Sequence, residues 1–110
     1  MRIIFANNEM RVEANNLKKL VEKYGQRKSR KIRQRLDEIA AASNFTDLNK
    51  LPAICCNYLD GQKSIMTLYT MPPSILVFSI AKNLEDLSNI QNYTWDDITL
   101  IEIMSLDGEI

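Results

Sequence analysis

Residues 26–42 read QRKSRKIRQRLDEIAAA and directly follow a glycine, Gly25. Their apolar residues recur at spacings that place them on one side of a helix: Ile32, Leu36, Ile39 and Ala40. This period predicts a helix from Gln26 to about Ala42, with one apolar face and a basic opposite face. Ser43-Asn44 is typical of a segment that ends such a helix.

A second amphipathic segment precedes Gly25, with apolar residues at i, i+3, i+4 and i+7: Leu17, Leu20, Val21 and Tyr24. Asn15 or Asn16 can cap its start, and Gly25 stands where a helix C-cap glycine belongs. Further upstream, Arg2 to Phe5 is β-branched and aromatic and predicts a first strand, closed by a turn at Ala6-Asn7-Asn8. We therefore expect a strand and then two antiparallel helices whose apolar faces pack on a sheet.

The pattern changes to strands after the linker from Phe45 to Pro52, which has room for one helical turn. Four strands are predicted: Ala53 to Leu59, Ile65 to Thr70, Ser74 to Ile80 and Ile98 to Met104. Asp60-Gly61 indicates a hairpin turn, Pro72-Pro73 a break, and Lys82 to Asp97 a polar excursion. The sequence thus predicts a single α+β domain over residues 1–110, in the order β-α-α-β-β-β-β, with two N-terminal helices on a mostly antiparallel sheet.

The composition is that of an ordinary globular protein, with 45% hydrophobic and 25% charged residues. The longest apolar run, Ile75 to Ala81, has the length of a strand, and the N-terminus lacks the pattern of a signal peptide, so we expect a cytoplasmic protein that is not in a membrane. Cys55 and Cys56 are neighbours on a predicted strand and would point to opposite faces, which disfavours a disulfide. Without any histidine to join them, we expect no metal and no cofactor.

The neutral net charge hides an asymmetry, because residues 1–35 carry eleven Lys and Arg against three Glu. Opposite charge in the two parts of the chain indicates either a polyanion-binding end or complementary contacts within and between chains. The densest cations lie on the predicted second helix: Arg27, Lys28, Arg30, Lys31 and Arg33. A row of this kind can bind RNA phosphates. The alternatives are a solvated face paired with acidic residues of the sheet, or the docking site of a protein partner.

Several stretches resemble one protein family, in the same order along the chain: Lys23-Tyr24-Gly25, Arg30 to Ile39, Ala41-Ala42-Ser43, Asp47-Leu48, Leu51-Pro52, Asp60 to Ser64, Pro73 with Leu76-Val77-Phe78, Trp95, Ile98-Thr99, and Ile101 to Met104. The set is similar to the RelE/ParE toxin superfamily, and within it to the HigB-like branch of plasmid maintenance killer proteins. The similarity spans nearly the whole chain. It implies the strand, two helices and four strands predicted above.

The resemblance also implies an activity, the metal-free cleavage of messenger RNA on the ribosome, and a partner, a protein antitoxin that is often a helix-turn-helix DNA binder. On this basis Lys63 and the five helix cations are candidate RNA-binding residues. Lys63 is also a catalytic candidate, with Tyr58, Tyr69 or Cys56 as substitutes in proton transfer. For Lys63 the alternative role is solubility at a hairpin tip, and for the two tyrosines it is packing within the sheet.

The chain departs from the family pattern at three places. Ser74-Ile75 stands where the family has an arginine on its central strand, Cys56 stands where it has a histidine, and Glu109-Ile110 replaces an aromatic–histidine ending. Two hypotheses follow from the residues that remain. One is a ribosome-dependent endoribonuclease; the other is a catalytically degenerate toxin-fold protein that binds its partner without cutting RNA. Action on gyrase, as in the ParE branch, is a third and weaker option.

Overall fold

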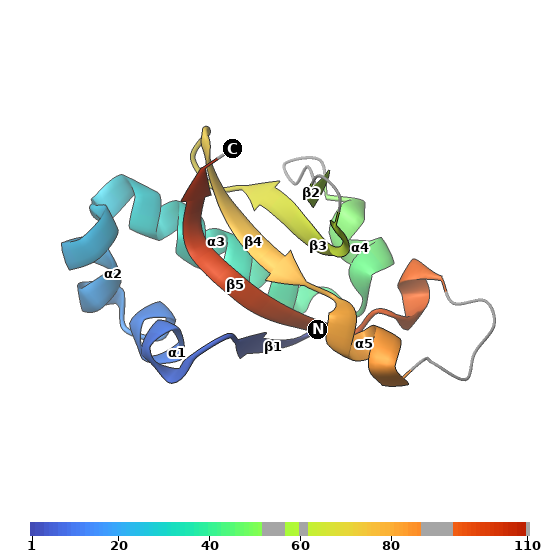
Figure 1. The fold of residues 1–110 in the computed structure, drawn as a ribbon. Coiled ribbons are helices and arrows are strands. Elements are labelled where there is room, and N and C mark those ends of the chain that lie inside the picture. The colour runs from blue at the N-terminus through green and yellow to red at the C-terminus, as the bar shows by residue number, and fades with distance from the viewer. Residues whose placement is uncertain (52–56, 60–61, 87–93, 110) are drawn as a thin grey trace.

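The computed structural model describes residues 1–51, 57–59, 62–86 and 94–109. These residues form the elements labelled in Figure 1: β1 (Arg2–Phe5), α1 (Asn8–Ala14), α2 (Leu17–Tyr24), α3 (Gln26–Ala41), α4 (Phe45–Asn49), β2 (Asn57–Leu59), β3 (Gln62–Tyr69), β4 (Ser74–Ser79), α5 (Ala81–Asp86), the short 3-10 helix η1 (Trp95–Asp97) and β5 (Leu100–Glu109). The predicted α+β class is confirmed, whereas α1 and α5 are additional to the predicted order β-α-α-β-β-β-β.

The strands form one sheet in the order β1-β5-β4-β3-β2. Strand β1 runs parallel to β5, with Ile3 opposite Ile101, and every other neighbouring pair is antiparallel. The predicted, mostly antiparallel sheet is therefore confirmed among the described residues. Because β5 lies between β1 and β4, the first and last strands of the chain are neighbours.

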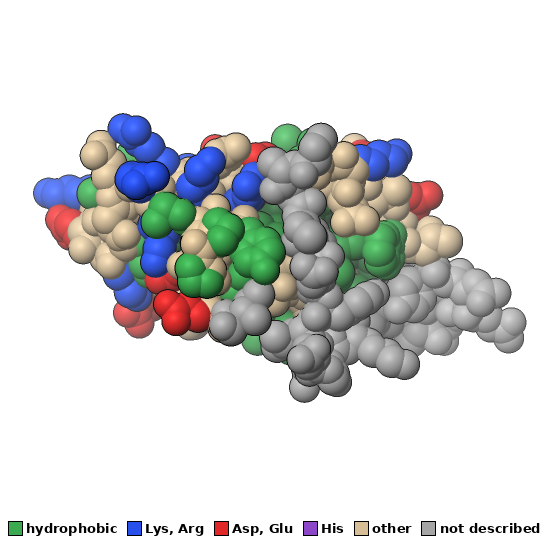
Figure 2. Space-filling model, turned by 90° about the horizontal axis from the view of Figure 1, so that it is seen from above, with side chains coloured by type: hydrophobic (Ala, Val, Ile, Leu, Met, Phe, Trp, Pro, Cys, Tyr) green, Lys and Arg blue, Asp and Glu red, His purple; other side chains and the backbone are tan. Residues whose placement is uncertain are grey.

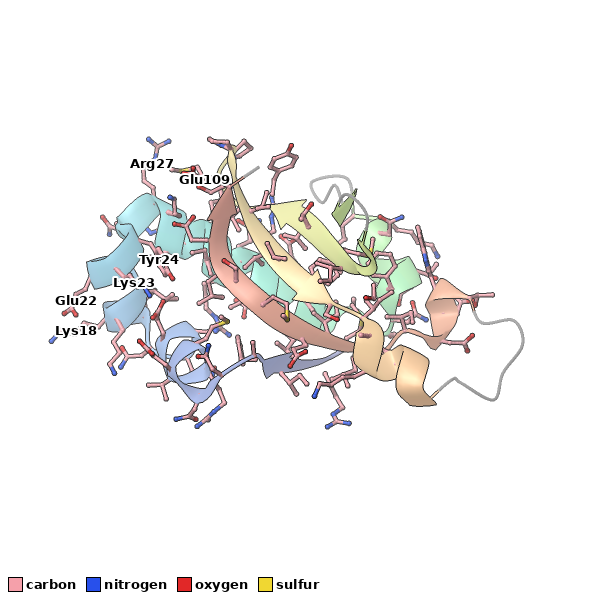
Figure 3. The ribbon with its side chains drawn as sticks, viewed as in Figure 1. Lys18, Glu22, Lys23, Tyr24, Arg27 and Glu109 are labelled. Atoms are coloured by element: carbon pink, nitrogen blue, oxygen red, sulfur yellow. The ribbon has the colours of Figure 1, made fainter. Side chains whose placement is uncertain are left out.

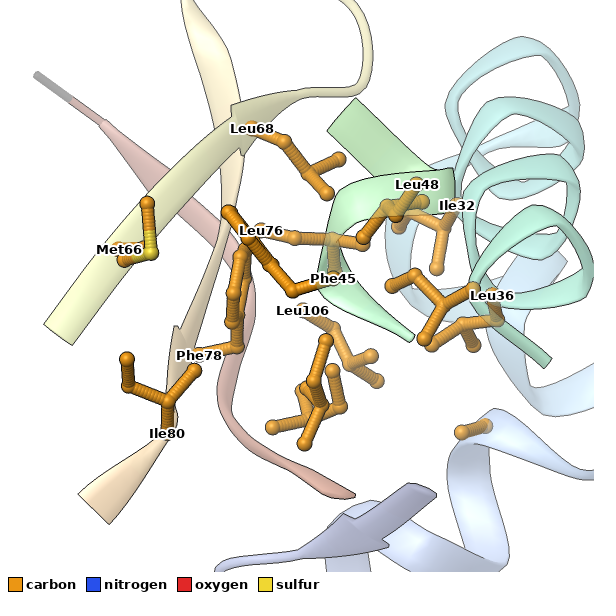
Figure 4. Close-up of a cluster of buried hydrophobic side chains, with 14 of the residues drawn as sticks. Ile32, Leu36, Phe45, Leu48, Met66, Leu68, Leu76, Phe78, Ile80 and Leu106 are labelled. Atoms are coloured by element: carbon orange, nitrogen blue, oxygen red, sulfur yellow. The ribbon is translucent and has the colours of Figure 1, made fainter. Parts of the chain in front are cut away.

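Helix α3 covers one face of this sheet and supplies the core expected of it (Figure 1). Ile32, Leu36 and Ile39 are at most 2% exposed, and Figure 4 shows the first two facing side chains of β3, β4 and α4. The helix ends one residue before the predicted Ala42. The placement of Ala40 on the buried apolar face is wrong: Ala40 is exposed, because it lies one position after Ile39 and so points to another side of the helix.

Helix α2 begins and ends as predicted but does not pack as predicted. The Asn16 side chain accepts a hydrogen bond from Lys19 N–H at 3.2 Å, and Gly25 N–H donates to Val21 O at 2.9 Å. Of the four apolar residues expected to face the sheet, Leu20 is buried, whereas Leu17 is 57% and Val21 36% exposed. Figure 1 shows α2 beyond the end of the sheet, so the helical hairpin with both apolar faces on the sheet is wrong for α2.

An additional helix explains this displacement. The predicted turn at Ala6-Asn7-Asn8 is instead the start of α1, because the Asn7 side chain accepts a hydrogen bond from Met10 N–H at 2.8 Å and caps the helix. Ala14, near the end of α1, is 1% exposed within the core. Helix α1 therefore occupies space next to β1 and α3, and α2 packs against α1 and α3.

The second half of the chain follows the predicted strands, with shifted ends. Strand β3 begins three residues before Ile65, β4 ends at Ser79, and β5 runs past the predicted Met104 to Glu109. Within the predicted polar excursion, α5 is held against β5 by Asn83, whose Oδ1 accepts from the N–H groups of Thr99 and Leu100 at 3.0 Å. The predicted turn at residues 60–61 and the two cysteines lie outside the described residues.

No helix in the described parts of the chain is long and apolar enough to cross a membrane.

Candidate nucleic-acid interface

Helix α3 divides the five predicted RNA-binding cations into two groups. Arg27, Arg30 and Lys31 are exposed, and within the described part of the chain none of them makes an ion pair. We call these three residues the basic triplet. Figure 3 shows Arg27 pointing away from the sheet, and Figure 2 shows Lys and Arg side chains gathered at the end of the molecule where α2 and α3 meet. The triplet is thus available to an anionic partner.

Lys28 and Arg33 are instead engaged in contacts within the protein. Lys28 Nζ lies 3.3 Å from Asp107 Oδ1, which ties the start of α3 to the end of β5. Arg33 donates to the Ala14 carbonyl at 3.0 Å and to Asp37 at 2.9 Å, which ties α3 to α1. For these two cations the structure favours pairing inside the protein over the binding of RNA phosphates.

A sixth cation of α3 has a structural role that the sequence did not indicate. Arg35 is only 6% exposed; its Nε donates to the Tyr69 carbonyl at 2.9 Å, and its Nη1 lies 3.0 Å from Glu38. A buried charge has to be paired and hydrogen-bonded in this way. The available signal was its position, three residues after Ile32, which places Arg35 beside the apolar face of the helix.

Of the four catalytic candidates, the structure describes the side chain of Tyr69 alone. Met66 and Leu68 of β3 point into the core, so Tyr69, which alternates with them, lies on the opposite face of the sheet and is half-buried there. Its carbonyl is held by Arg35, which places the end of β3 beside α3. Lys63 and Tyr58 lie on β3 and β2, but their side chains, like the whole of Cys56, fall outside the described parts.

Ile75, which the resemblance aligns with a strand arginine, is closed to solvent. Ile75 is 2% exposed on β4 and lies opposite Gly108 of β5. A Cβ atom added to Gly108 would lie 3.3 Å from Ile75 Cγ1 and 3.2 Å from Val77 Cγ2, so these two side chains fill the space above the glycine. Among the described residues, this part of the sheet is packed with apolar groups.

A polar cluster between α1 and α2 was not predicted. Lys23 Nζ lies 3.2 Å from the buried Glu13 carboxylate, and this hydrogen bond raises the pKa of Lys23. Burial, together with a hydrogen bond to Glu13, raises the pKa of Tyr24 to about 12. Both groups therefore keep their protons at neutral pH. The sequence offered no signal for the cluster, since Glu13 was assigned to no element.

The same cluster borders a cavity of about 390 Å³ that also reaches Glu9 and Asp107. Three carboxylates against one lysine make its wall acidic, which disfavours RNA phosphate there. In the described parts of the chain, no group of three or more His, Cys, Asp or Glu side chains is placed to hold a metal ion. The basic triplet is therefore the strongest candidate for contact with a nucleic acid.

Comparison of the chain with family models, curated proteins and solved structures gives no match in any of the three.

Proposed function

We propose that this chain is a toxin-like component of a type II toxin–antitoxin pair, similar to RelE and HigB, that acts on ribosome-bound messenger RNA. The support is the ordered resemblance along the sequence, together with an element order in which β1 is followed by helices and then by β2 to β5. Its protein partner in this proposal is an antitoxin, typically of the helix-turn-helix kind.

The observation that carries the RNA contact is the basic triplet. Arg27, Arg30 and Lys31 project from one helix into solvent, whereas Lys28 and Arg33 of the same helix are occupied by contacts inside the protein. Free cations on a rigid helix bind phosphates without regard to sequence, because each contact releases condensed counterions. Such a surface suits a ligand as large and as highly charged as the ribosome.

Cosedimentation with ribosomes over a series of salt concentrations tests this contact. Replacing the triplet with alanine (Arg27→Ala, Arg30→Ala, Lys31→Ala) should weaken binding and reduce the slope of log K against log salt by about 2, since each phosphate contact contributes about 0.7.

The matched control removes the same charge from exposed residues elsewhere: Arg2→Ala, Lys19→Ala and Lys50→Ala. It should leave the slope nearly unchanged. If the two triple variants lose affinity equally, general charge rather than α3 accounts for binding, and the proposed contact is wrong.

A second candidate function is favoured by Ile75. Because this buried isoleucine stands where the family has an arginine, the chain is also suited to bind an antitoxin or another protein without cutting RNA. Mapping messenger RNA cuts after expression in a bacterium separates the two functions. Cuts that disappear in Lys63→Ala favour the nuclease, and their absence in a chain that still binds ribosomes favours the binder.

A further inference from the structure

Strand β1 has one paired edge and one open edge. Its paired edge is fixed by hydrogen bonds from Arg2 N–H to Thr99 O at 3.0 Å and from Ala6 N–H to Ile103 O at 2.9 Å. Backbone groups alternate along a strand, so the N–H and C=O groups of Ile3 and Phe5 point away from β5. Among the described residues they have no hydrogen-bond partner. In Figure 1, β1 accordingly forms the outer edge of the sheet.

The open edge faces a groove of about 450 Å³ between β1, α1 and α3. Three consecutive residues of β1, Ile3 to Phe5, line it, and side chains of consecutive strand residues point to opposite faces of the sheet. The groove therefore runs along the strand's edge, where both faces meet. Its far wall is formed by Leu36 and Ala40 of α3.

The charged residues of the groove are all positive. Arg11 of α1 and Arg33 of α3 line it, and no acidic residue does so in the described part of the chain. Arg11 donates to the neutral Asn8 side chain at 2.7 Å, so its charge is not neutralised by that contact. Arg2 is exposed at the beginning of the same strand.

We propose that this groove binds an extended, acidic segment of a partner protein, which adds a strand to the open edge of β1. Ile3 and Phe5 each offer one donor and one acceptor to the added strand, as in other complexes formed by strand addition. Alternate side chains of the segment would contact Leu36 and Ala40, and its acidic residues would meet Arg11. Arg33, the other cation of the groove, is already paired with Asp37 at 2.9 Å.

A second copy of this chain is a poorer occupant. Pairing two β1 edges would bring Arg2 and Arg11 of both copies together, and neither has an acidic partner in the described residues. The proposal does not depend on RNA contacts of the basic triplet, and it stands even if ribosome binding fails.

The test uses the full chain and a fluorescein-labelled peptide of about seven residues in which valine and glutamate alternate, a length typical of one strand. We expect saturable binding, measured by fluorescence anisotropy, and slowed amide hydrogen exchange at Ile3 and Phe5 in the complex. Two control peptides should each bind at least about tenfold more weakly. A peptide with lysine in place of glutamate loses the attraction to the positive groove, and one with proline at its two central valines loses backbone N–H donors of the strand pairing.

Two neighbouring alanines of α3 provide a matched pair of variants. Both are exposed, but Ala40 lines the groove and Ala41 does not. Ala40→Phe should weaken peptide binding about tenfold or more by filling the groove, whereas Ala41→Phe should leave it unchanged. Equal melting temperatures of the two variants establish that both remain folded.

Three results would overturn the proposal: binding of the glutamate and lysine peptides with equal affinity, an equal loss of binding in both variants, and exchange protection that excludes Ile3 and Phe5. Protection of these two amides in the free chain, accompanied by a dimer mass, would assign the edge to a second copy instead.

Discussion

At the scale of single residues, Ile75 decides whether this sheet could carry the strand arginine of the RelE- and HigB-like pattern that the sequence resembles. Ile75→Arg would place a guanidinium in an apolar, nearly solvent-free position beside the Val77 side chain and the backbone of Gly108. We expect the free energy of unfolding, measured by urea denaturation, to fall by roughly 3 kcal/mol or more, because a buried charge without a partner is among the costliest substitutions.

Met104→Arg is the control for this variant, because Met104 lies on the neighbouring strand β5 and is 40% exposed. Its stability should stay within about 0.5 kcal/mol of the parent chain, as for most surface substitutions. An Ile75→Arg protein as stable as Met104→Arg would show that the sheet accommodates the arginine and that the packing above Gly108 is looser than described.

The six cations of α3 show how far residue types alone predict the candidate site. The amphipathic pattern correctly indicated a basic helix face, and Arg27 and Lys31 are exposed on it. The spacing places Arg35 beside the apolar face but could not indicate its partner, the Tyr69 carbonyl, which comes from a strand 34 residues away in the sequence. Lys28 and Asp107 meet for the same kind of reason, across 79 residues.

At the scale of elements, the junction between α2 and α3 depends on one backbone conformation. Gly25 has φ +82°, and a Cβ added there would meet no atom within 4 Å. Gly25→Ala should therefore destabilise the protein through backbone strain alone, by roughly 1–3 kcal/mol, visible as a lower midpoint of urea denaturation. Gln26→Ala, the adjacent exposed position in the first turn of α3, should change the midpoint little. Equal midpoints for the two variants would mean that Gly25 does not hold this conformation in solution.

Local signals predicted the elements well where they were strong. Gly25 and the period of Ile32, Leu36 and Ile39 placed α3 to within one residue of its end. Helix α1 was missed because an Asn pair serves equally well in a turn and at a helix start, and only tertiary packing of Ala14 distinguishes them. The spacing of apolar residues shows that they share one face of a helix, but it does not show which element packs against that face. For this reason the exposure of Leu17 was not predicted.

At the scale of the whole molecule, the charge asymmetry of the sequence is only partly neutralised by the fold. Lys28 with Asp107 joins the basic part of the chain to the acidic part, and Arg33 with Asp37 and Arg35 with Glu38 act within α3. The basic triplet, together with Arg2 and Arg11 beside β1, remains without such partners in the described residues. Two positive surfaces on different elements leave room for two different ligands, RNA at α3 and an acidic polypeptide at β1.

Binding and cleavage should therefore separate in this protein. The helix cations to which we attribute ribosome binding do not depend on Ile75 or Cys56, and we expect affinity that weakens steeply with salt. Cleavage should be slight, because the chain has no histidine and no strand arginine at Ile75. Removal of one charge-stabilising group typically costs about 10²–10³ in rate, and loss of a general acid or base costs about 10²–10⁴. These losses are not additive within one site, so their product would overstate the deficit.

Primer extension on messages from purified ribosomes, with and without the chain, measures this expectation directly. Bound protein that produces few or no new 5′ ends would agree with it, and Lys63→Ala should then change neither binding nor the pattern of ends. Strong, ribosome-dependent cleavage that disappears in Lys63→Ala would contradict it. Such a result would mean that Lys63, with a proton carrier such as Tyr69, can replace the arginine and histidines of the pattern that the sequence resembles. Lys63 would then stabilise the negative charge of the transition state, because it is the only cation near the hairpin of β2 and β3 that the resemblance assigns.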